Sequence, residues 1–498
     1  MNAPTHKKRK ISPSAESIEI TNSSSSNKEG VEAGDDSSPT NSSNINQKPF
    51  IDDIIFEILR FLDSLFIIRI CMKISKQWRQ VSFQIPLSLS FRSALSNQGR
   101  ERIKLLANCQ CLKNLTSLGL YNNGIGNEEG VVHIANCGHL KNLTCLNLEG
   151  NGIGFEDVKS IANSEYLKNL TSLDLGSNSI WVYGVELIAN SECFKNLTCL
   201  NLSYNQTGSE GVRYISQSEH LKSLTSLDLS YNNIGNEGVK HVAYCEQSKN
   251  LKKLNLGGNE IDKEGVSCIA NSEYLKNLTC LNLSDNPIGN EGVKYISNSA
   301  SLKLLISLQL SRNHFGSEGA KYISNSECLK NLTYLDLRFN QIGNEGVKYI
   351  ANSECFKNLT SLDLTCNRIS SEGINFMSSS TYLKSLTSLY LKYNLIGNEG
   401  AKCIANSGHF QNLTFLDLSN TYIGNYGVKY IAKSERSKNL KKLNLAHNSI
   451  GTEGVSCIAN SEYLKNLTSL DLSENGIGND VIRHIMQERS EITEHQDD

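Results

Sequence analysis

The sequence predicts an α/β solenoid, a curved horseshoe with a parallel sheet on its concave side and helices on its convex side. The string L-x-x-L-x-L-x-x-N recurs fourteen times between Leu115 and Asn475. Twelve of the thirteen intervals between the closing residues are 27 residues, and the first is 28. Repeats of this length form one strand and one helix each, and they bury their apolar faces only by stacking on their neighbours.

One repeat, residues 332–358, shows how the pattern divides. LTYLDLRFN predicts a short strand and a turn, and EGVKYIANS predicts a helix with Asn344 as its N-cap and Glu345 in its first turn. Val347 and Ile350 are three residues apart and are expected to face the strands. The Asn that closes the string is expected to have a structural role, which is to satisfy backbone groups in the turn. The closing residue is Asn in every repeat except one, where it is Thr421.

Composition and pattern divide the chain into five segments. We expect residues 1–48, with the basic cluster Lys7-Lys8-Arg9-Lys10, to be a disordered tail, because they are polar and almost free of aromatic residues. Residues 49–82 form a small helical module, and residues 83–114 form a degenerate capping repeat with Leu89 and Phe91 on its strand. The fourteen repeats occupy residues 115–478. Residues 479–498 are a C-terminal capping helix and a short acidic tail.

Charge and composition argue against several classes of partner. The net charge of −2 provides no general attraction for nucleic acid or an anionic membrane. The most apolar stretch, residues 54–74, is interrupted by five charged residues, and no secretory signal follows the basic cluster. We therefore expect a cytoplasmic or nuclear protein whose 15 cysteines are free thiols and whose N-L-T triplets carry no glycan.

No constellation typical of an enzyme is recognisable. The ten histidines are scattered, no cysteine pair has zinc-ligand spacing, and nothing predicts a cofactor or a metal. Asp336 and its equivalents in other repeats form a ladder along the strands, alternating with Asn in sister repeats such as Asn444. We interpret this ladder as part of the repeat pattern and expect it to be solvated on the concave face.

A candidate binding surface appears where the concave positions depart from Ser, Asp, Asn and Gly. Large aromatic and basic side chains are favoured at binding hot spots, and Arg312 and Arg338 are suited to carboxylates or phosphates of a partner. An earlier pair, Tyr204 and Tyr231, is a lesser candidate, and neutral variation on an exposed surface is the alternative. The predicted substrate-binding residues are Arg312, Tyr334, Arg338, Phe339, Tyr390, Lys392, Tyr393 and Phe415.

The helical module of residues 49–82 carries more apolar surface than it can bury by itself. Apolar residues between Ile51 and Leu62 repeat at helical spacing, and a second helix is predicted from Ile67 to Ile74, with Trp78 one turn further on. Some 35 residues are too few for a stable core. This surface must therefore be covered, either by the first repeat, so that the module is a cap, or by another protein.

The repeats resemble the ribonuclease-inhibitor-like subclass of leucine-rich repeat proteins. The resemblance rests on the run L-x-x-L-x-L-x-x-N-x-I-G-x-E-G-V-x-x-I-A, as in Leu332 to Ala351. It implies the horseshoe fold and partner binding through the concave face and the rims. That subclass includes inhibitors, sensors and Ran GTPase activators; the activators typically end in a long acidic segment, whereas this chain ends in EITEHQDD.

The stretch FIDDIIFEILRFLDSLFIIRICMKISKQWRQV resembles an F-box, with its acidic pair, I-x-x-I-L-x-F-L-D and K-x-W-R. The family usually begins Leu-Pro, whereas this chain has Phe50-Ile51 with Pro49 one place earlier. The resemblance implies docking on a Skp-type adaptor of a cullin ubiquitin ligase, with the repeats holding a protein substrate and the chain doing no chemistry itself. The alternative is a non-catalytic scaffold or inhibitor. The implied adaptor contacts are Phe50, Ile51, Ile54, Ile55, Ile58, Leu59, Leu62 and Trp78.

Overall fold

A computed structural model of the chain describes Ile55, residues 72–82, 84–91, 99–109, 112–126 and 129–478, and Val481. Contacts divide the chain after Phe50, so all of these residues belong to the second unit, Ile51–Asp498. The predicted disordered tail, most of the helical module and almost all of the predicted C-terminal helix and tail lie outside the described residues.

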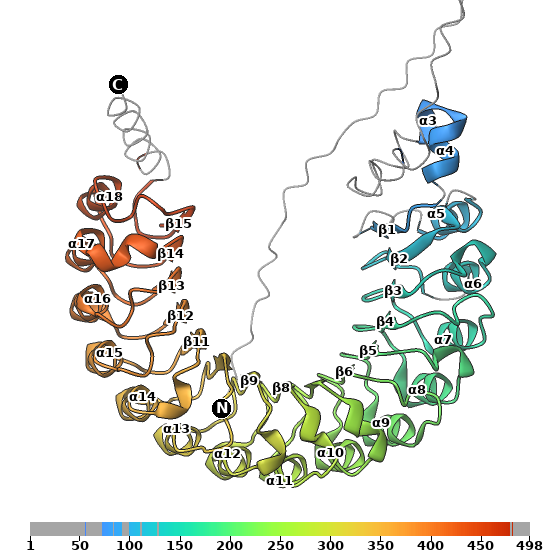
Figure 1. The fold of residues 1–498 in the computed structure, drawn as a ribbon, viewed down its shortest axis with the longest axis horizontal. Coiled ribbons are helices and arrows are strands. Elements are labelled where there is room, and N and C mark those ends of the chain that lie inside the picture. Colours follow the sequence, from blue (N-terminus) through green and yellow to red (C-terminus); the bar gives the residue numbers. More distant parts are fainter. Residues whose placement is uncertain are drawn as a thin grey trace, which may run out of the picture. The chain divides into compact units, whose positions relative to one another are not determined.

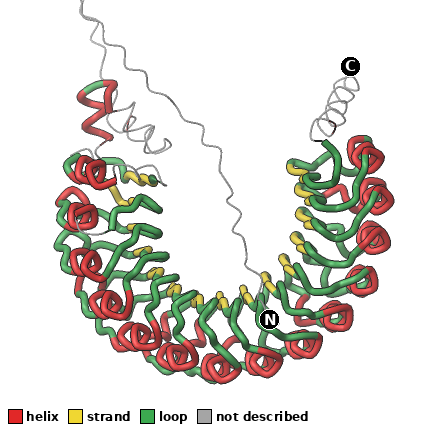
Figure 2. The backbone as a smooth tube through the Cα atoms, turned by 180° about the vertical axis from the view of Figure 1, so that it is seen from behind, coloured by secondary structure: helices red, strands yellow, loops and turns green. Residues whose placement is uncertain are grey.

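The described strands form one parallel sheet of 15 strands in chain order, β1 to β15. The strands line the inner side of a horseshoe and the helices line its outer side (Figures 1 and 2). The predicted solenoid is therefore confirmed for these residues. The strands are β1 (Leu87–Ser90), β2 (Leu115–Gly119), β3 (Cys145–Asn147), β4 (Ser172–Asp174), β5 (Cys199–Asn201), β6 (Ser226–Asp228), β7 (Lys253–Asn255), β8 (Cys280–Asn282), β9 (Ser307–Gln309), β10 (Tyr334–Asp336), β11 (Ser361–Asp363), β12 (Ser388–Tyr390), β13 (Phe415–Asp417), β14 (Lys442–Asn444) and β15 (Ser469–Asp471).

One helix follows each strand up to β14, and 3-10 turns lead into several of the strands. The α-helices are α3 (Met72–Ile74), α4 (Lys76–Ser82), α5 (Gly99–Ala107), α6 (Glu129–Ala135), α7 (Phe155–Ala162), α8 (Trp181–Ala189), α9 (Gly208–Gln217), α10 (Gly235–Ala243), α11 (Lys263–Ala270), α12 (Gly289–Ser297), α13 (Ser317–Ser324), α14 (Gly343–Ala351), α15 (Ser371–Ser378), α16 (Gly397–Asn406), α17 (Asn425–Lys433) and α18 (Thr452–Ala459). The 3-10 turns are η3 (Gly138–Leu140), η4 (Glu192–Phe194), η5 (Glu246–Asn250), η6 (Leu275–Asn277), η7 (Ala300–Leu302), η8 (Glu354–Phe356) and η9 (Glu435–Asn439).

The strand β1 precedes the fourteen regular repeats and brings the number of described strands in the sheet to 15. It contains Leu89 and pairs in parallel with β2, with a register shift after Leu87. Phe91 lies just beyond its end and donates its backbone N–H to Gly119 O. Leu87 and Leu89 are buried in the same core as the repeats.

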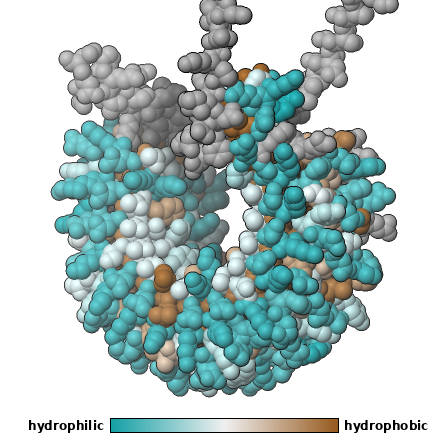
Figure 3. All heavy atoms as spheres, turned by 45° about the vertical axis from the view of Figure 1, so that its right-hand side comes forward, coloured by the Kyte–Doolittle hydropathy of each residue, from teal (hydrophilic) through white to brown (hydrophobic). Residues whose placement is uncertain are grey.

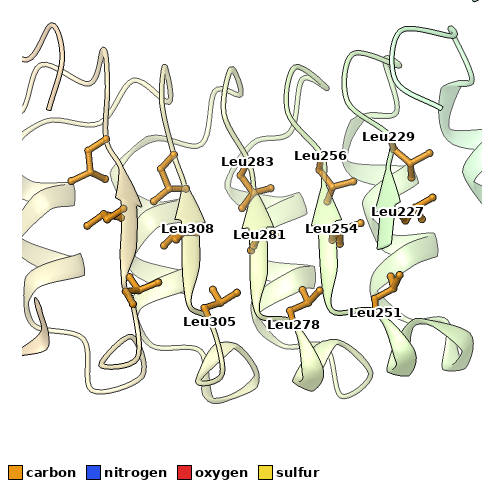
Figure 4. Close-up of a cluster of buried hydrophobic side chains, with 14 of the residues drawn as sticks. Leu227, Leu229, Leu251, Leu254, Leu256, Leu278, Leu281, Leu283, Leu305 and Leu308 are labelled. Atoms are coloured by element: carbon orange, nitrogen blue, oxygen red, sulfur yellow. The ribbon is translucent and has the colours of Figure 1, made fainter. Parts of the chain in front are cut away.

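Three leucines from each repeat form the core behind the sheet. Leu251, Leu254 and Leu256 are buried and stack on their equivalents one repeat further along, Leu278, Leu281 and Leu283 (Figure 4). Each buried leucine side chain contributes roughly 1.5–3 kcal/mol relative to an exposed one. Because every leucine packs mainly against the next repeat, the array gains this energy only as a stack.

The Asn that closes each strand string is buried and joins neighbouring repeats through its amide. Asn394 donates through Nδ2 to Leu364 O of the preceding repeat (2.9 Å) and to Leu391 O of its own (2.8 Å). Its Oδ1 accepts the N–H groups of Asn367 and Ile369, both at 3.0 Å. The expected structural task of this Asn is confirmed, because backbone groups of two repeats depend on one side chain.

Two residues interrupt this ladder. Thr421 donates its hydroxyl to Leu418 O (2.5 Å). A threonine has no amide oxygen, however, to accept the backbone N–H groups of Asn394 and Ile396 in the preceding repeat. Pro287 cannot adopt the positive φ that the residue after the Asn has in most repeats, and Ile288 N–H donates to Asn286 O instead. The Oδ1 of Asn313, which would have accepted that N–H, is buried without a hydrogen-bond partner.

Replacing Thr421 by Asn should complete the ladder at repeat twelve. We expect Thr421→Asn to raise the free energy of unfolding by about 1 kcal/mol, the typical net contribution of such a hydrogen bond. Denaturant unfolding followed by circular dichroism measures the change. Asn394→Thr is the matched reverse substitution and should destabilise by at least as much. A lower melting midpoint for Thr421→Asn would contradict the role assigned to the missing amide.

A second Asn ladder caps the helices across repeats. The sequence predicts Asn344 as the N-cap of its own helix, and this is wrong: Asn344 lies inside α14 and its Oδ1 accepts the N–H of Ser370, at the start of the next helix. Asn398 likewise accepts the N–H groups of Gly424 and Gly427 at 2.8 and 2.9 Å. The reason is geometric, because stacking brings the first turn of one helix beside the cap position of the next.

The second Gly of strings such as I-G-N-E-G makes room for this cap, because a Cβ added to Gly427 would lie 2.7 Å from Asn398 Oδ1. We expect Asn398→Ala to lower the free energy of unfolding by about 1 kcal/mol, the usual loss when a helix cap is removed. Asn406→Ala, at the exposed end of α16, is the control and should change stability little. Equal stabilities of the two variants in a chemical unfolding experiment would show that Asn398 caps nothing of consequence.

Candidate protein-binding surface

Parallel pairing places the outward-facing strand residues in rows that run along the concave face. Tyr334 and Phe415 share one row with Ser361 and Ser388 between them. Tyr390 lies in the neighbouring row, between Asp363 and Asp417. Its ring is 4.7 Å from the Phe415 ring, at 37° between the planes. The structure therefore brings Tyr390 and Phe415 together as one aromatic pair on β12 and β13.

Arg338 is already used by the protein itself. Its Nη2 lies 2.7 Å from Asp336 Oδ2, and its Nε lies 3.4 Å from Asp363 Oδ2 on the next strand. The hydrogen bonds to Asp336 raise the pKa of the Arg338 guanidinium above its usual value. Arg338 therefore links neighbouring strands of the concave surface, and its predicted binding of a partner's carboxylates stays a prediction.

The prediction that the aspartate ladder is solvated is wrong for Asp336, Asp363 and Asp417, which are buried. By contrast, Asp174 and Asp228 in earlier repeats are partly exposed and Asp471 is exposed. The difference lies in their neighbours, because large side chains such as Tyr334 and Arg338 stand where earlier repeats have small ones. Burial, followed by the charges of Asp336 and Asp363, raises the pKa of Tyr334 to about 12.

Burial also raises the pKa of Asp363 from 3.8 to about 6, against the hydrogen bonds from Thr365 that favour the charged form. A carboxyl group whose pKa is raised by folding stabilises the fold at low pH, and this contribution disappears as the pH rises through the folded-state value.

We therefore expect Asp363 to stabilise the protein less at pH 8 than at pH 5. Part of the loss falls below pH 5, where the unfolded-state carboxyl ionises; between pH 5 and the folded-state pKa of about 6, at about 1.4 kcal/mol per pKa unit, the loss is about 1.4 kcal/mol. The measurement is the difference in unfolding free energy between wild type and Asp363→Asn across this range. Asn occupies the same strand position in sister repeats, as at Asn444, so the substitution fits. Asp471→Asn on β15 controls for the loss of a charge at an exposed position. A difference that grows toward pH 8 in favour of wild type would contradict burial as the dominant cause.

Five of the predicted substrate-binding residues lie beyond the ends of the strands, namely Arg312, Arg338, Phe339, Lys392 and Tyr393. Arg312, Phe339 and Tyr393 each precede the ladder Asn and have positive φ, between 53° and 57°. Strand alternation therefore does not place them, and they stand on the turns at the carboxyl ends of the strands, along one rim of the horseshoe. Lys392 lies over the Tyr393 ring, with Nζ 4.9 Å from its centre.

The turn positions of six successive repeats form a connected row, which we call the rim row. It consists of Tyr204, Tyr231, Gly258, Asp285, Arg312 and Phe339. The rings of Tyr204 and Tyr231 are stacked, with centres 4.3 Å apart and 10° between planes. The Tyr231 hydroxyl donates to Asp285 Oδ2 at 2.7 Å, which raises the pKa of that phenol.

The row continues from Asp285 to Arg312 and Phe339. Arg312 Nε is 3.6 Å from Asp285 Oδ1, and its guanidinium carbon lies 4.1 Å from the centre of the Phe339 ring. Gly258 allows the crossing, because a Cβ there would lie 2.4 Å from the Tyr231 ring. The early tyrosine pair and the later Arg312–Phe339 pair, which the sequence presents as alternatives, therefore belong to one row.

Sequence reasoning missed a third group of exposed aromatic residues, at the starts of α7 and α8. Phe155 and Tyr183 lie with ring centres 6.4 Å apart, and Trp181 is 49% exposed. Trp181 has a φ of 59°, and the residues at this position with a similar angle in other repeats are all Gly, namely Gly208, Gly235, Gly289, Gly343 and Gly397. The signal was present in the sequence, because WVYG replaces the usual GNEG at this position. Figure 3 shows a mostly hydrophilic surface on which apolar residues form separate small patches.

Most of the predicted adaptor contacts, namely Phe50, Ile51, Ile54, Ile58, Leu59 and Leu62, lie outside the described residues. Ile55 is fully buried, and it belongs to the same core as Val81 of α4 and Leu87 of β1. Trp78 in α4 is half-buried and packs against that core. For these two residues the structure shows packing within the chain.

The described part of the chain offers no other chemistry of note. Among these residues, no group of His, Cys, Asp and Glu is arranged to hold a metal ion. Every described cysteine is free, and burial raises the pKa of the Cys355 thiol to about 12. No described helix combines the length and the apolar character that crossing a bilayer requires.

The comparisons with known proteins address the repeats. No curated protein matches the chain. An internalin from Listeria monocytogenes is similar in structure, at 21% identity with a TM-score of 0.46, over 75% of this chain and 94% of the internalin. The TLR13–ssRNA13 complex is similar at 23% identity with a TM-score of 0.43, over 72% of this chain, which spans 46% of the TLR13 chain.

A family model described as Leucine Rich repeat matches eleven segments that together make up about half of the chain. The match begins at residue 139, near the end of the first regular repeat, and does not extend to residues 49–82. The segments are residues 139–162, 195–216, 220–243, 247–270, 274–297, 302–324, 328–351, 357–377, 382–405, 436–459 and 463–480. With the 15-stranded sheet and its convex helices, this match shows that the chain belongs to the leucine-rich repeat family.

Proposed function

We propose that this protein recruits substrates to a Skp–cullin–F-box ubiquitin ligase. The observation that carries the proposal is the F-box-like sequence of residues 50–81, which directly precedes a continuous repeat array. The helical module binds a Skp-type adaptor, and the repeats bind the protein substrate. A solenoid suits the second task, because its stacked strands expose a long concave surface.

The protein itself then does no chemistry. Holding a substrate beside the ubiquitin-loaded enzyme raises the effective concentration of a target lysine, and this alone accelerates transfer. Support for the substrate side comes from the aromatic pair Tyr390–Phe415 and from the rim row, since aromatic residues and arginine dominate binding hot spots. The free-thiol state of the described cysteines suits a protein of the cytoplasm or nucleus.

A second function is favoured by the burial of Ile55 and the packing of Trp78. Both contribute to the core that begins the solenoid, which is what a simple cap would do. In that case the protein is a non-catalytic scaffold or inhibitor that acts through the repeats alone. A Ran GTPase activator is a weaker alternative, since the F-box-like stretch of residues 50–81 is not typical of that family.

Adaptor capture by the full-length protein separates these functions. We expect wild type to retain a purified Skp-type adaptor, and Ile58→Asp with Leu59→Asp to lose it, because two carboxylates would be desolvated in an apolar interface. Ile74→Asp, at an exposed position of α3, is the matched control and should retain binding. Circular dichroism of each variant checks that the solenoid stays folded.

Two results would contradict the proposal. Either the wild-type protein fails to capture the adaptor, or the double variant captures it as well as wild type does. Both would leave the helical module as a cap. If instead the double variant unfolds, a second pair of substitutions to Ala tests the same surface with less disruption.

A further inference from the structure

The rim row is preorganised, and its parts hold one another in place. Asp285 receives both the Tyr231 hydroxyl and Arg312, so one carboxylate positions an aromatic ring and a guanidinium that are three repeats apart in sequence. The Phe339 ring supports the guanidinium from one side. Side chains that are already fixed lose little entropy when a partner binds.

The row nevertheless stays open to solvent. The side chain of Arg312 is 55% exposed, and Tyr204 and Tyr231 are 51% and 38% exposed. Arg312 Nε lies 3.6 Å from Asp285 Oδ1, which is longer than a hydrogen bond, so the exposed guanidinium can still donate hydrogen bonds to a partner. This distinguishes Arg312 from Arg338, whose guanidinium is taken up by two carboxylates. A guanidinium lying flat on a ring is suited to a carboxylate or a phosphate.

The row is also linear. It presents one side chain per repeat, and successive parallel strands are about 4.8 Å apart. Tyr231 and Arg312 are three repeats apart, so their positions are separated by roughly 14 Å. An extended chain advances about 3.4 Å per residue and covers that distance in about four residues.

We propose that the rim row binds an extended peptide segment of a partner protein, with a ring side chain on the Tyr204–Tyr231 pair and an acidic side chain on Arg312 about four residues further along. The ring gains aromatic contact and apolar burial, and the acidic group gains a charge-assisted pair. Lys392 on Tyr393, two repeats beyond Phe339, adds a second cation for an acidic segment. This inference rests on the proposed function in that the partner is the substrate.

Single-stranded RNA is the other ligand that aromatic residues and arginine commonly bind. The surroundings of the row favour a peptide. The concave floor beside it carries Asp228, Asp336 and Asp363, and the chain as a whole has a net charge of −2. A phosphate backbone needs several cations along its path, whereas one acidic side chain needs only Arg312.

The test uses the full-length protein and fluorescein-labelled decapeptides that contain one Phe and one acidic residue, separated by zero to seven alanine or glycine residues. Glu, phosphoserine and Gln versions of each peptide compare carboxylate, phosphate and neutral groups. Fluorescence anisotropy should show the tightest binding with about three intervening residues. The Gln version should bind about tenfold more weakly or worse.

Two variants should weaken binding of the best peptide by about tenfold or more, namely Arg312→Ala and Tyr204→Ala. The matched controls are Arg213→Ala on α9, where the arginine pairs with Glu210, and Tyr422→Ala, an exposed tyrosine of repeat twelve outside the row. Both should bind like wild type. Thermal melts verify that the four variants fold, which is expected because the substituted side chains lie on the surface.

Several results would overturn the inference. One is that no peptide of the series binds, and another is that binding shows no dependence on spacing or on Arg312. Loss of binding on Trp181→Ala with Tyr183→Ala, without loss on the rim variants, would place the site at α8. Tight binding of oligouridine that requires Tyr204 and Arg312 would replace the peptide by RNA. Adaptor capture by the rim variants is measured in parallel, so that failure of the peptide site is distinguishable from failure of the proposed function.

Discussion

The fold depends on amide side chains that are buried where one repeat meets the next. Every repeat turns sharply after its strand, and the turn leaves backbone N–H and C=O groups in an apolar interior. One Asn satisfies them in every repeat except the twelfth, which has Thr421, and it does so across the boundary, as Asn394 joins Leu364 to Leu391. Hydrogen bonds of this kind contribute little net energy each, but an unpaired group in the interior is destabilising. The ladder therefore fixes the register in which the leucines stack.

The same constraint shapes the surface. The residue before each ladder Asn has positive φ in all fourteen repeats, whatever its type. Its side chain is excluded from the core and stands on the rim, and its identity is free to vary because the backbone conformation is set by the neighbouring amide. A row of variable positions is thereby held at regular spacing on a rigid frame, which is a favourable arrangement for recognition.

The concave floor and the rim differ in electrostatics. On the floor, Asp336 and Asp363 are buried and compensated by Arg338, so charge there is largely internal. On the rim, Arg312 is supported by Phe339 and Asp285 while its side chain remains half exposed. Ion pairs that are already made add little to partner binding, whereas a supported and open guanidinium can add a new pair. The rim is therefore better suited than the concave floor to form a new ion pair with a partner.

The sequence by itself determined the repeat length, the strand and helix of each repeat, and the leucine and Asn positions of the core. The reason is that a repeat of 27 residues can bury its apolar face only by stacking on its neighbours, strand beside strand and helix beside helix. It also singled out the aromatic and basic departures. Tertiary structure decided what these departures do. Arg338 proved to be internally paired, Asn344 proved to cap the next helix, and Tyr231 proved to reach Asp285 two repeats away. The contacts Arg338–Asp363, Asn344–Ser370 and Tyr231–Asp285 join residues 25 to 54 positions apart, and only the stacked array brings those groups together.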